Sequence, residues 1–193
     1  MSPRVGLTTD AVVDLALTLV DEAGPDALTL AKVAERAGVA APSLYKHVKN
    51  LADLRRLIDL KVVTEMAETL RASATGREGG DAVAALADAY RAYLRRYPNR
   101  SQALVTAPDE SDAELSRATH AVADVVFAVL RPFGFDQAQA VHGTRCLRAA
   151  VQGFAGLEAS GGFGRPEDVD KSFEVLKTML VQGLTAYSKK AGR

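Results

Sequence analysis

The sequence predicts an all-α protein of about nine helices. Apolar residues recur at intervals of three and four along most of the chain, and no stretch sustains the alternating pattern of a β-strand. The chain has 193 residues, of which 48% are apolar and 25% charged, as is typical of a soluble globular protein. This length allows either one large domain or a small domain joined to a medium one.

The composition also limits where the protein works. No apolar run approaches the roughly 20 residues needed to span a bilayer, and the N-terminus lacks the basic-then-apolar pattern of a signal peptide. The single cysteine, Cys146, cannot form an internal disulfide and is either a small buried apolar side chain or, less simply, a redox group. We therefore expect a cytoplasmic protein with no membrane partner.

Charge is distributed unevenly although the net charge is zero. Residues 32–61 hold seven basic side chains against three acidic ones (Glu35, Asp53 and Asp59), so this window carries +4 and the remainder −4; the basic ones are Lys32, Arg36, Lys46, Lys49, Arg55, Arg56 and Lys61. A local positive surface on an otherwise acidic protein is suited to phosphates. The alternative is a set of ordinary solvated helix faces.

Two helices are predicted before residue 38. Thr8 to Asp10 offer capping oxygens before an apolar repeat that Gly24 and Pro25 end. Thr29 is a second N-cap, and it precedes a short helix over Leu30–Ala37.

A third short helix follows a glycine corner. Gly38 permits the positive φ of a tight bend, and Pro42 suits the first turn of the next helix. Leu44 and Val48 are four residues apart and point into a small core, which leaves polar side chains between them on the other faces. Three short helices of this kind predict either a helix-turn-helix or a plain helical hairpin with a solvated face.

A long helix over residues 51–74 comes next, capped by Asn50 and roughly 30 Å or more in length. Its exposed Arg55 and Arg56 either reach phosphates or only face solvent. Residues 73–80 form a polar, glycine-containing loop, so we place a domain boundary there. The expected organisation is a DNA-binding domain at 1–50, the linker helix at 51–74 and a second domain at 75–193.

The second domain is predicted to hold helices over 81–97, 100–107, 111–130, 136–160 and 166–189. The last two have wide apolar faces, which favours a four-helix bundle between two subunits over a purely internal core. The expected dimer contacts are small residues on the first of the two and an apolar stripe on the second: Ala149, Gly153, Gly156, Phe173, Leu176, Leu180 and Leu184.

The second domain also contains aromatic residues that either line a ligand cavity or belong to plain core. They are Tyr90, Tyr93, Tyr97, Phe127, Phe133, Phe135 and Phe154. No catalytic constellation is visible: Gly161–Gly164 lacks the lysine of a phosphate loop, and His120 with Asp124 has no third metal ligand at a sensible spacing. We expect no enzyme, no metal and no cofactor.

The residues around the glycine corner resemble the DNA-binding domain of the TetR family of repressors. The matching motifs are Leu-Thr-x-x-x-Val-Ala-x-x-Ala-Gly-Val at 28–39, Pro-Ser-Leu-Tyr-Lys-His-Val-Lys-Asn at 42–50 and Leu-x-Asp-Leu at 51–54. The resemblance covers roughly residues 8–60. It implies a set of DNA-contacting residues, called here the reader set: Thr29, Lys32, Pro42, Ser43, Tyr45, Lys46, His47 and Lys49.

The resemblance also implies a homodimeric repressor that leaves a near-palindromic operator when a small, often aromatic or amphipathic effector binds. Ala31 and Ala41 stand where the prototype of the family has a base-reading arginine and glutamine, so a different operator is expected. Two alternatives stay open: a TetR-like regulator without ligand control, and a helical small-molecule binding protein.

Overall fold

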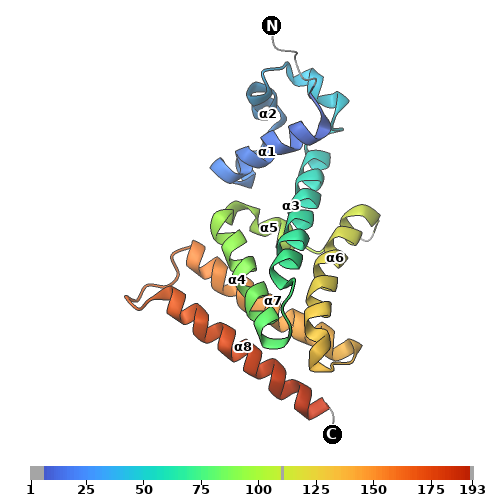
Figure 1. Cartoon of the computed structure of the whole chain (residues 1–193). Coiled ribbons are helices and arrows are strands. Elements are labelled where there is room, and N and C mark those ends of the chain that lie inside the picture. Colours follow the sequence, from blue (N-terminus) through green and yellow to red (C-terminus); the bar gives the residue numbers. More distant parts are fainter. Residues whose placement is uncertain (1–6, 110, 192–193) are drawn as a thin grey trace. The chain divides into compact units, whose positions relative to one another are not determined.

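The computed structural model describes residues 7–109 and 111–191 (Figure 1). The chain divides into two compact units. The N-terminal unit contains the residues up to Val63 together with Asn99–Leu115, and the C-terminal unit contains Thr64–Pro98 and the chain from Ser116 onward. Val63 and Thr64 both lie within one long helix, so the chain passes between the units without a break in its helical hydrogen bonding.

The N-terminal unit begins with short helices packed around a small apolar core. Its elements are α1 (Thr9–Ala23), the 3-10 helix η1 (Pro25–Ala27), α2 (Leu30–Ala37), the 3-10 helix η2 (Ala41–Lys46) and the start of α3 (Leu51–Ala74). Each main element contributes to the core, and the side chains with no exposed surface are Val12, Ala16, Val33, Leu44 and Leu54. Every expected element before residue 74 therefore has a counterpart.

A later segment of the chain completes the N-terminal unit. It carries η3 (Pro98–Arg100) and α5 (Ser101–Val105). Arg100, only 8% exposed, donates two hydrogen bonds to the Asp21 carboxylate of α1 at 2.8 and 2.6 Å, and the Asn99 amide donates to the Asp21 carbonyl at 3.1 Å. These bonds fix the segment to α1 through polar groups.

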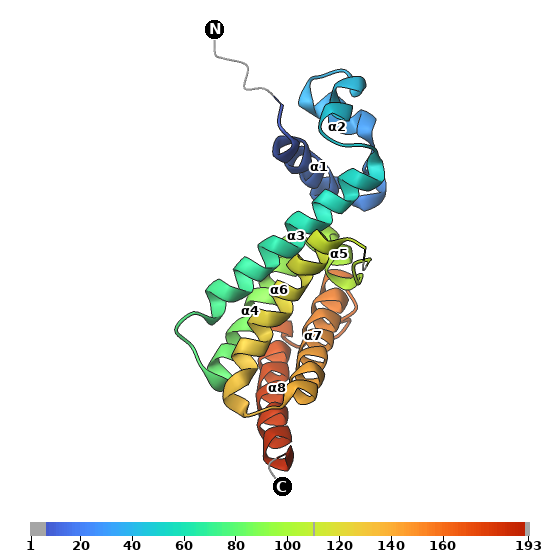
Figure 2. The ribbon, with the colours of Figure 1, turned by 90° about the vertical axis from the view of Figure 1, so that its right-hand side faces the viewer.

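The C-terminal unit is built from the end of α3, α4 (Gly79–Arg96), α6 (Ala113–Leu130), η4 (Arg131–Phe133), α7 (Gln137–Ala159) and α8 (Val169–Ala191). Figure 2 shows α4, α7 and α8 running alongside one another, and these three helices pack pairwise. Gly143 permits a close approach here, because an added Cβ would lie 3.2 Å from Leu130 and 3.3 Å from Leu184.

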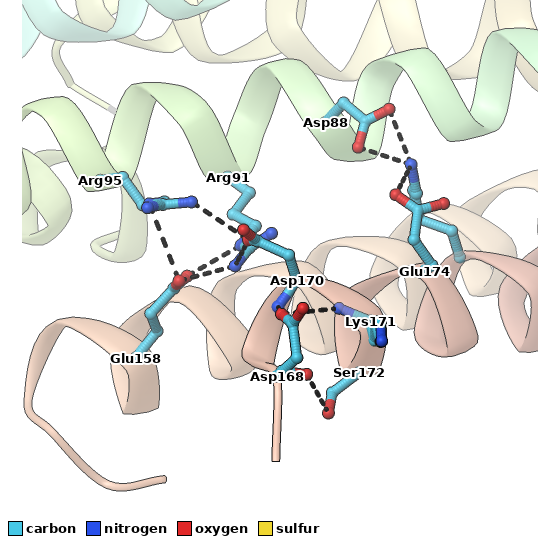
Figure 3. Close-up of polar contacts among 10 residues, drawn as sticks. Asp88, Arg91, Arg95, Glu158, Asp168, Asp170, Lys171, Ser172 and Glu174 are labelled. Carbon is cyan, nitrogen blue, oxygen red and sulfur yellow. Dashed lines mark hydrogen bonds and ion pairs between the residues drawn. The ribbon is translucent and has the colours of Figure 1, made fainter. Parts of the chain in front are cut away.

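Charged groups join α4 to the ends of α7 and α8 (Figure 3). Arg91 of α4 is 7% exposed; it donates to the Glu158 carboxylate at 2.8 and 2.6 Å and pairs with Asp170 at 2.7 Å. Its guanidinium also lies 4.5 Å from the Phe173 ring centroid and 5.3 Å from that of Phe154. One buried cation thus contacts α7 and α8 simultaneously.

The all-α prediction is confirmed for residues 7–109 and 111–191, in which the structure has helices and no strand. The nine expected helices correspond to α1–α8 and η2, although several ends differ by one to three residues. The last helix begins at Val169 rather than 166, because the Asp168 carboxylate accepts the N–H groups of Asp170 and Lys171 and so caps it there.

Within these residues, no individual helix is both long enough and apolar enough to cross a membrane. The two segments Ala113–Phe133 and Gln137–Ala159 are long and apolar enough only when they are counted together, and the chain bends by 115° between them.

Candidate nucleic-acid interface

Helix α2 begins at a capped N-terminus. Thr29 has an extended backbone, and its hydroxyl oxygen accepts the Lys32 N–H at 3.2 Å, as the sequence predicted. The earliest N–H groups of any α-helix have no partner within the helix, so they are available to an anion. The exposed start of α2 is therefore suited to a backbone phosphate.

Gly38 ends α2 in the left-handed conformation, with φ 65° and ψ 30°. The Gly38 N–H donates to the Glu35 carbonyl and the Val39 N–H to the Ala34 carbonyl, each at 3.1 Å. These bonds satisfy carbonyl groups that the last turn would otherwise leave open, and they turn the chain toward η2.

The second helix of the motif is a 3-10 helix, where the sequence predicts a short helix with Pro42 in its first turn. Its bonds join residues three apart: the Ser43 N–H donates to the Ala40 carbonyl and the His47 N–H to the Leu44 carbonyl, both at 2.8 Å. This 3-10 helix spans six residues, Ala41–Lys46.

Three residues per turn assign the side chains of η2 to distinct faces. Leu44 is fully buried, and His47, three residues later, is half-buried on the same side. Tyr45 follows Pro42 by three residues, and both are exposed, with Tyr45 60% accessible. Thus η2 presents Tyr45 outward while Leu44 anchors it to the core.

The reader set is mostly on the surface of the N-terminal unit. Thr29, Lys32, Pro42, Tyr45, Lys46 and Lys49 are exposed, and Ser43 and His47 are half-buried. The backbone beside Lys49 is held by two bonds: the Lys49 N–H donates to the Asp53 carboxylate at 2.8 Å, and the Asp53 N–H donates to the Asn50 side chain at 2.9 Å. The Lys49 side chain is therefore exposed on a fixed backbone.

Three basic residues of the 32–61 window are held by carboxylates. Arg36 donates to both oxygens of Glu22, at 2.7 and 2.8 Å, and this hydrogen bonding lowers the pKa of the Glu22 carboxyl. Lys61 forms an ion pair with Asp14. These cations therefore have partners within their own unit.

Arg56 is the third of these paired cations. Its guanidinium donates to Asp112 at 2.5 and 2.9 Å and to Glu114 at 2.7 Å. Asp112 and Glu114 lie 56 and 58 positions after Arg56 in the sequence. Their pairing with Arg56 argues against the alternative that Arg56 contacts phosphates. No local sequence pattern reveals it.

The other four basic residues of the window are Lys32, Lys46, Lys49 and Arg55. None of them has an ion pair or hydrogen bond from its side chain within the described part of the chain. Three of the four belong to the reader set. Within the 32–61 window, most of the unpaired positive charge therefore lies where the motif predicts DNA.

The seven aromatic residues expected at a ligand cavity do not form one group. The Tyr90 hydroxyl donates to Gln152 at 3.0 Å, and the Tyr93 hydroxyl donates to Glu65 at the same distance. The ring contacts fall into separate sets: Tyr93 with Tyr97, Phe133 with Phe135 and Tyr187, and Phe154 with Phe163 and Phe173. Phe127 is half-buried. Their role as a pocket stays a prediction.

The expected dimer residues divide between the surface and the core of the C-terminal unit. Ala149, Gly153 and Gly156 are exposed on α7. On α8, however, Phe173 and Leu184 are 1% and 7% exposed and pack within their own unit, while Leu176 and Leu180 are half-buried.

The outward apolar stripe of α8 consists of other residues. Val175 is 53% and Met179 64% exposed, and Tyr187 is 38% exposed. Helix α8 is apolar on two sides, and Phe173 and Leu184 lie on its inner side, so their part in a dimer interface stays a prediction. A second subunit would meet Val175 and Met179 first.

Residues 7–109 and 111–191 contain no cluster of three or more histidine, cysteine or acidic side chains able to hold a metal ion. Cys146 is a free, exposed thiol, which corrects the expectation that it is buried. The prominent chemistry of the described structure is thus a surface of unpaired cations on a compact helical motif. This is the architecture of helix-turn-helix transcriptional regulators.

Sequence comparison identifies the family. Residues 12–56 match the profile of "Bacterial regulatory proteins, tetR family", and residues 83–180 match that of "Tetracyclin repressor-like, C-terminal domain". The chain belongs to the TetR family of DNA-binding transcriptional regulators.

Relatives match along nearly the whole chain. The HTH-type transcriptional regulator Rv0681 of Mycobacterium tuberculosis is 35% identical over 92% of this chain and 82% of its own length. YobS of Bacillus subtilis, another HTH-type transcriptional regulator, is 30% identical over 98% of both chains. The apo structure of ActR from Streptomyces coelicolor has the same fold, with a TM-score of 0.73, 21% identity and coverage of 99% of each chain.

Proposed function

We propose that this regulator is a homodimeric repressor that binds a near-palindromic operator through the reader set and leaves it when a small molecule binds the C-terminal unit. The main support is the location of the unpaired cations Lys32, Lys46 and Lys49 on the motif itself. Two readers would enter successive major grooves about 34–36 Å apart.

Within each reader, two kinds of contact are proposed. Tyr45 and Lys46 are exposed on η2 and would contact phosphates and base edges, while Lys49 and the start of α2 at Thr29 would hold the flanking backbone. Ala31 is exposed and carries no polar group, so it cannot donate to a base edge. The operator is therefore expected to differ from that of the tetracycline repressors.

The proposed dimer uses the outer faces of α7 and α8. Ala149, Gly153 and Gly156 offer a surface that a helix of the partner can approach closely, and an added Cβ at either glycine would meet nothing within 4 Å. Exposed Val175 and Met179 add apolar area on α8. Burial of these side chains by a second subunit would supply the hydrophobic part of the association.

Ligand control is proposed from the family. ActR of Streptomyces coelicolor has also been solved in complex with (S)-DNPA, with a TM-score of 0.68 to this chain. We extend to this protein a small-molecule effector, a cytoplasmic location and no enzymatic activity or cofactor. A coupling of about 1–3 kcal/mol between effector and operator is typical of such switches.

The decisive experiment is selection of operator DNA from a random pool by the full chain, followed by gel-shift titration of variants on the selected site. Tyr45→Ala and Lys46→Ala should weaken operator binding while sedimentation still shows a dimer. The affinity falls with salt, and the magnitude of the slope of log affinity against log salt should decrease by about two when Lys46 loses one phosphate contact in each of the two readers.

Lys171→Ala, an exposed lysine of α8 outside the reader set, serves as the matched control and should bind as the wild type does. Unchanged affinity of both reader variants at matched salt would contradict the assignment of the interface.

A regulator without ligand control is the second candidate. It is favoured by the aromatic residues of the C-terminal unit, which contact one another and polar side chains rather than gathering at one cavity. A thermal-shift screen of small molecules, with each hit tested for operator release, separates the two candidates.

A further inference from the structure

The C-terminal unit contains a cavity that none of the expected aromatic residues lines. Its volume is about 470 Å³, and its walls come from the end of α3, the loop that follows it, and α6 with Pro132. Small-molecule sites usually measure about 300–1,000 Å³, so this cavity is large enough for a metabolite-sized ligand.

Part of the cavity wall is apolar. Ala74 contributes from the last turn of α3, and Val125, Ala128 and Val129 contribute from α6, with Pro132 just beyond that helix. Val125 and Val129 are 8% and 7% exposed, so they form a floor continuous with the core of the unit. A ligand with an apolar body would cover this floor.

The remaining wall carries charges of both signs. Arg71 and Arg77 lie on the side of α3 and its following loop, Asp124 lies on α6, and Glu78 follows Arg77. Two cations and two anions cancel, so the wall favours a ligand of zero net charge that itself carries both signs over a simple anion.

Two of these charges have no partner in the described structure. Arg77 donates to the Ser73 carbonyl at 2.8 Å, but no hydrogen bond or ion pair of the Arg71 or Asp124 side chain occurs within residues 7–109 and 111–191. Elsewhere in the same unit, Arg91 and Lys177 each pair with two carboxylates. Arg71 on α3 and Asp124 on α6 are both exposed and thus keep their hydrogen-bonding capacity at one cavity.

We infer that this cavity is a binding site for a small zwitterion with an apolar body, such as an apolar amino acid or a short peptide. The Arg71 guanidinium receives the carboxylate, the Asp124 carboxylate receives the ammonium group, and the apolar body covers Val125 and Val129. Charge-assisted bonds of this kind are among the strongest that a small ligand makes.

If the protein is the ligand-controlled repressor proposed above, on which this step rests, the cavity is its effector site. A ligand bound there would act on α3. Arg71 and Ala74 lie in the last turns of this helix, which begins at Leu51 directly after the reader set. A zwitterion that joins Arg71 to Asp124 would hold the end of α3 against α6. The position of α3 within the C-terminal unit would then depend on ligand.

Calorimetric titration of the full chain with three matched probes tests the site. L-phenylalanine carries both charges, phenylalaninamide lacks the carboxylate and N-acetylphenylalanine lacks the ammonium group. The wild type should bind L-phenylalanine at least about ten-fold more tightly than either derivative. Glu68→Gln on α3 and Arg145→Gln on α7, both exposed and outside the cavity, should bind all three as the wild type does.

The cavity variants should lose different probes. Arg71→Gln should weaken the binding of L-phenylalanine and N-acetylphenylalanine but leave the binding of phenylalaninamide unchanged. Asp124→Asn should weaken the binding of L-phenylalanine and phenylalaninamide but leave the binding of N-acetylphenylalanine unchanged. No heat of binding at millimolar L-phenylalanine, or equal loss of all probes in both variants, would overturn the inference.

Gel shifts on the selected operator separate this inference from the proposed function. L-phenylalanine should weaken operator binding by the wild type, and Arg71→Gln should bind the operator normally but ignore the probe. Operator binding that no probe alters refutes the effector site alone. Absence of operator binding without any probe refutes the proposed repressor.

Discussion

Replacement of Arg91 by methionine should destabilise the C-terminal unit more than any exposed substitution. Methionine keeps an unbranched apolar stem but removes the guanidinium, which lies near the Phe154 and Phe173 rings. The Arg91 side chain is 9% exposed, and its partner Glu158 is 17% exposed. The variant therefore leaves a largely buried carboxylate without its main partner.

The expected loss is about 3 kcal/mol. Removal of one member of a buried ion pair typically costs about 3–5 kcal/mol, because the other charge stays desolvated. Here Arg95 lies 3.7 Å from Glu158 and would compensate in part, and Asp170, 70% exposed, returns to solvent at little cost. These two contacts place the estimate at the lower end of the range.

Thermal and urea unfolding at one fixed protein concentration measure this loss, because association also contributes to the stability of a dimer. A loss of about 3 kcal/mol corresponds to about 10 °C in Tm for a unit of this size. Arg145→Met, on an exposed arginine of α7, should change stability by less than about 0.5 kcal/mol.

The double variant Arg91→Met with Glu158→Met should recover much of the loss, since the desolvated Glu158 carboxylate is then also absent. A free energy of unfolding of Arg91→Met within about 0.5 kcal/mol of the wild type, or a double variant less stable than the single one, would refute a stabilising role of the Arg91–Glu158 pair.

Two further predictions concern α3 and α4. The hydrogen bond from Arg56 lowers the folded-state pKa of Asp112, so this pair stabilises the protein above the ordinary carboxyl pKa of about 3.9 and loses its effect as the pH falls through the lowered value. At pH 7 the urea midpoint of unfolding should be higher for the wild type than for Asp112→Asn, and this difference should become smaller below about pH 4. A difference that does not change with pH would contradict the pairing. Gly80→Ala should lower Tm, because its Cβ would lie 2.7 Å from Val181 Cγ1, and the second substitution Val181→Ala should restore part of the loss.

Elements set by neighbouring residues could be predicted from the sequence. Thr8, Thr29 and Asn50 were each expected as N-caps, and each side chain accepts a backbone N–H three residues later. Gly38 has the positive φ that its position after α2 required. Caps and corners depend on two to five consecutive residues, so the sequence pattern contains all the information needed for them.

Contacts between distant residues could not be predicted in this way. Arg36 and Arg56 looked like any other basic residues of the 32–61 window, yet the first pairs with Glu22 and the second with Asp112. The sequence does not distinguish the outer face of α8 from its inner face, for a similar reason. Phe173 and Met179 both suit an apolar face, and only the packing of α4 and α7 determines which of them is covered.

These pairings explain how a chain of zero net charge can carry a DNA-binding surface. The 24 basic residues equal the 24 acidic ones, so total charge gives no long-range attraction to DNA. Within the 32–61 window, however, carboxylates engage Arg36, Arg56 and Lys61 and leave Lys32, Lys46, Lys49 and Arg55 without an ion pair in the described structure. Phosphate binding depends on cations that can exchange solvent ions for phosphate, and a cation already held by a carboxylate would first have to break that pair. Pairing therefore concentrates the effective positive charge on α2, η2, the turn before α3 and the start of α3, although the sequence spreads it over thirty residues.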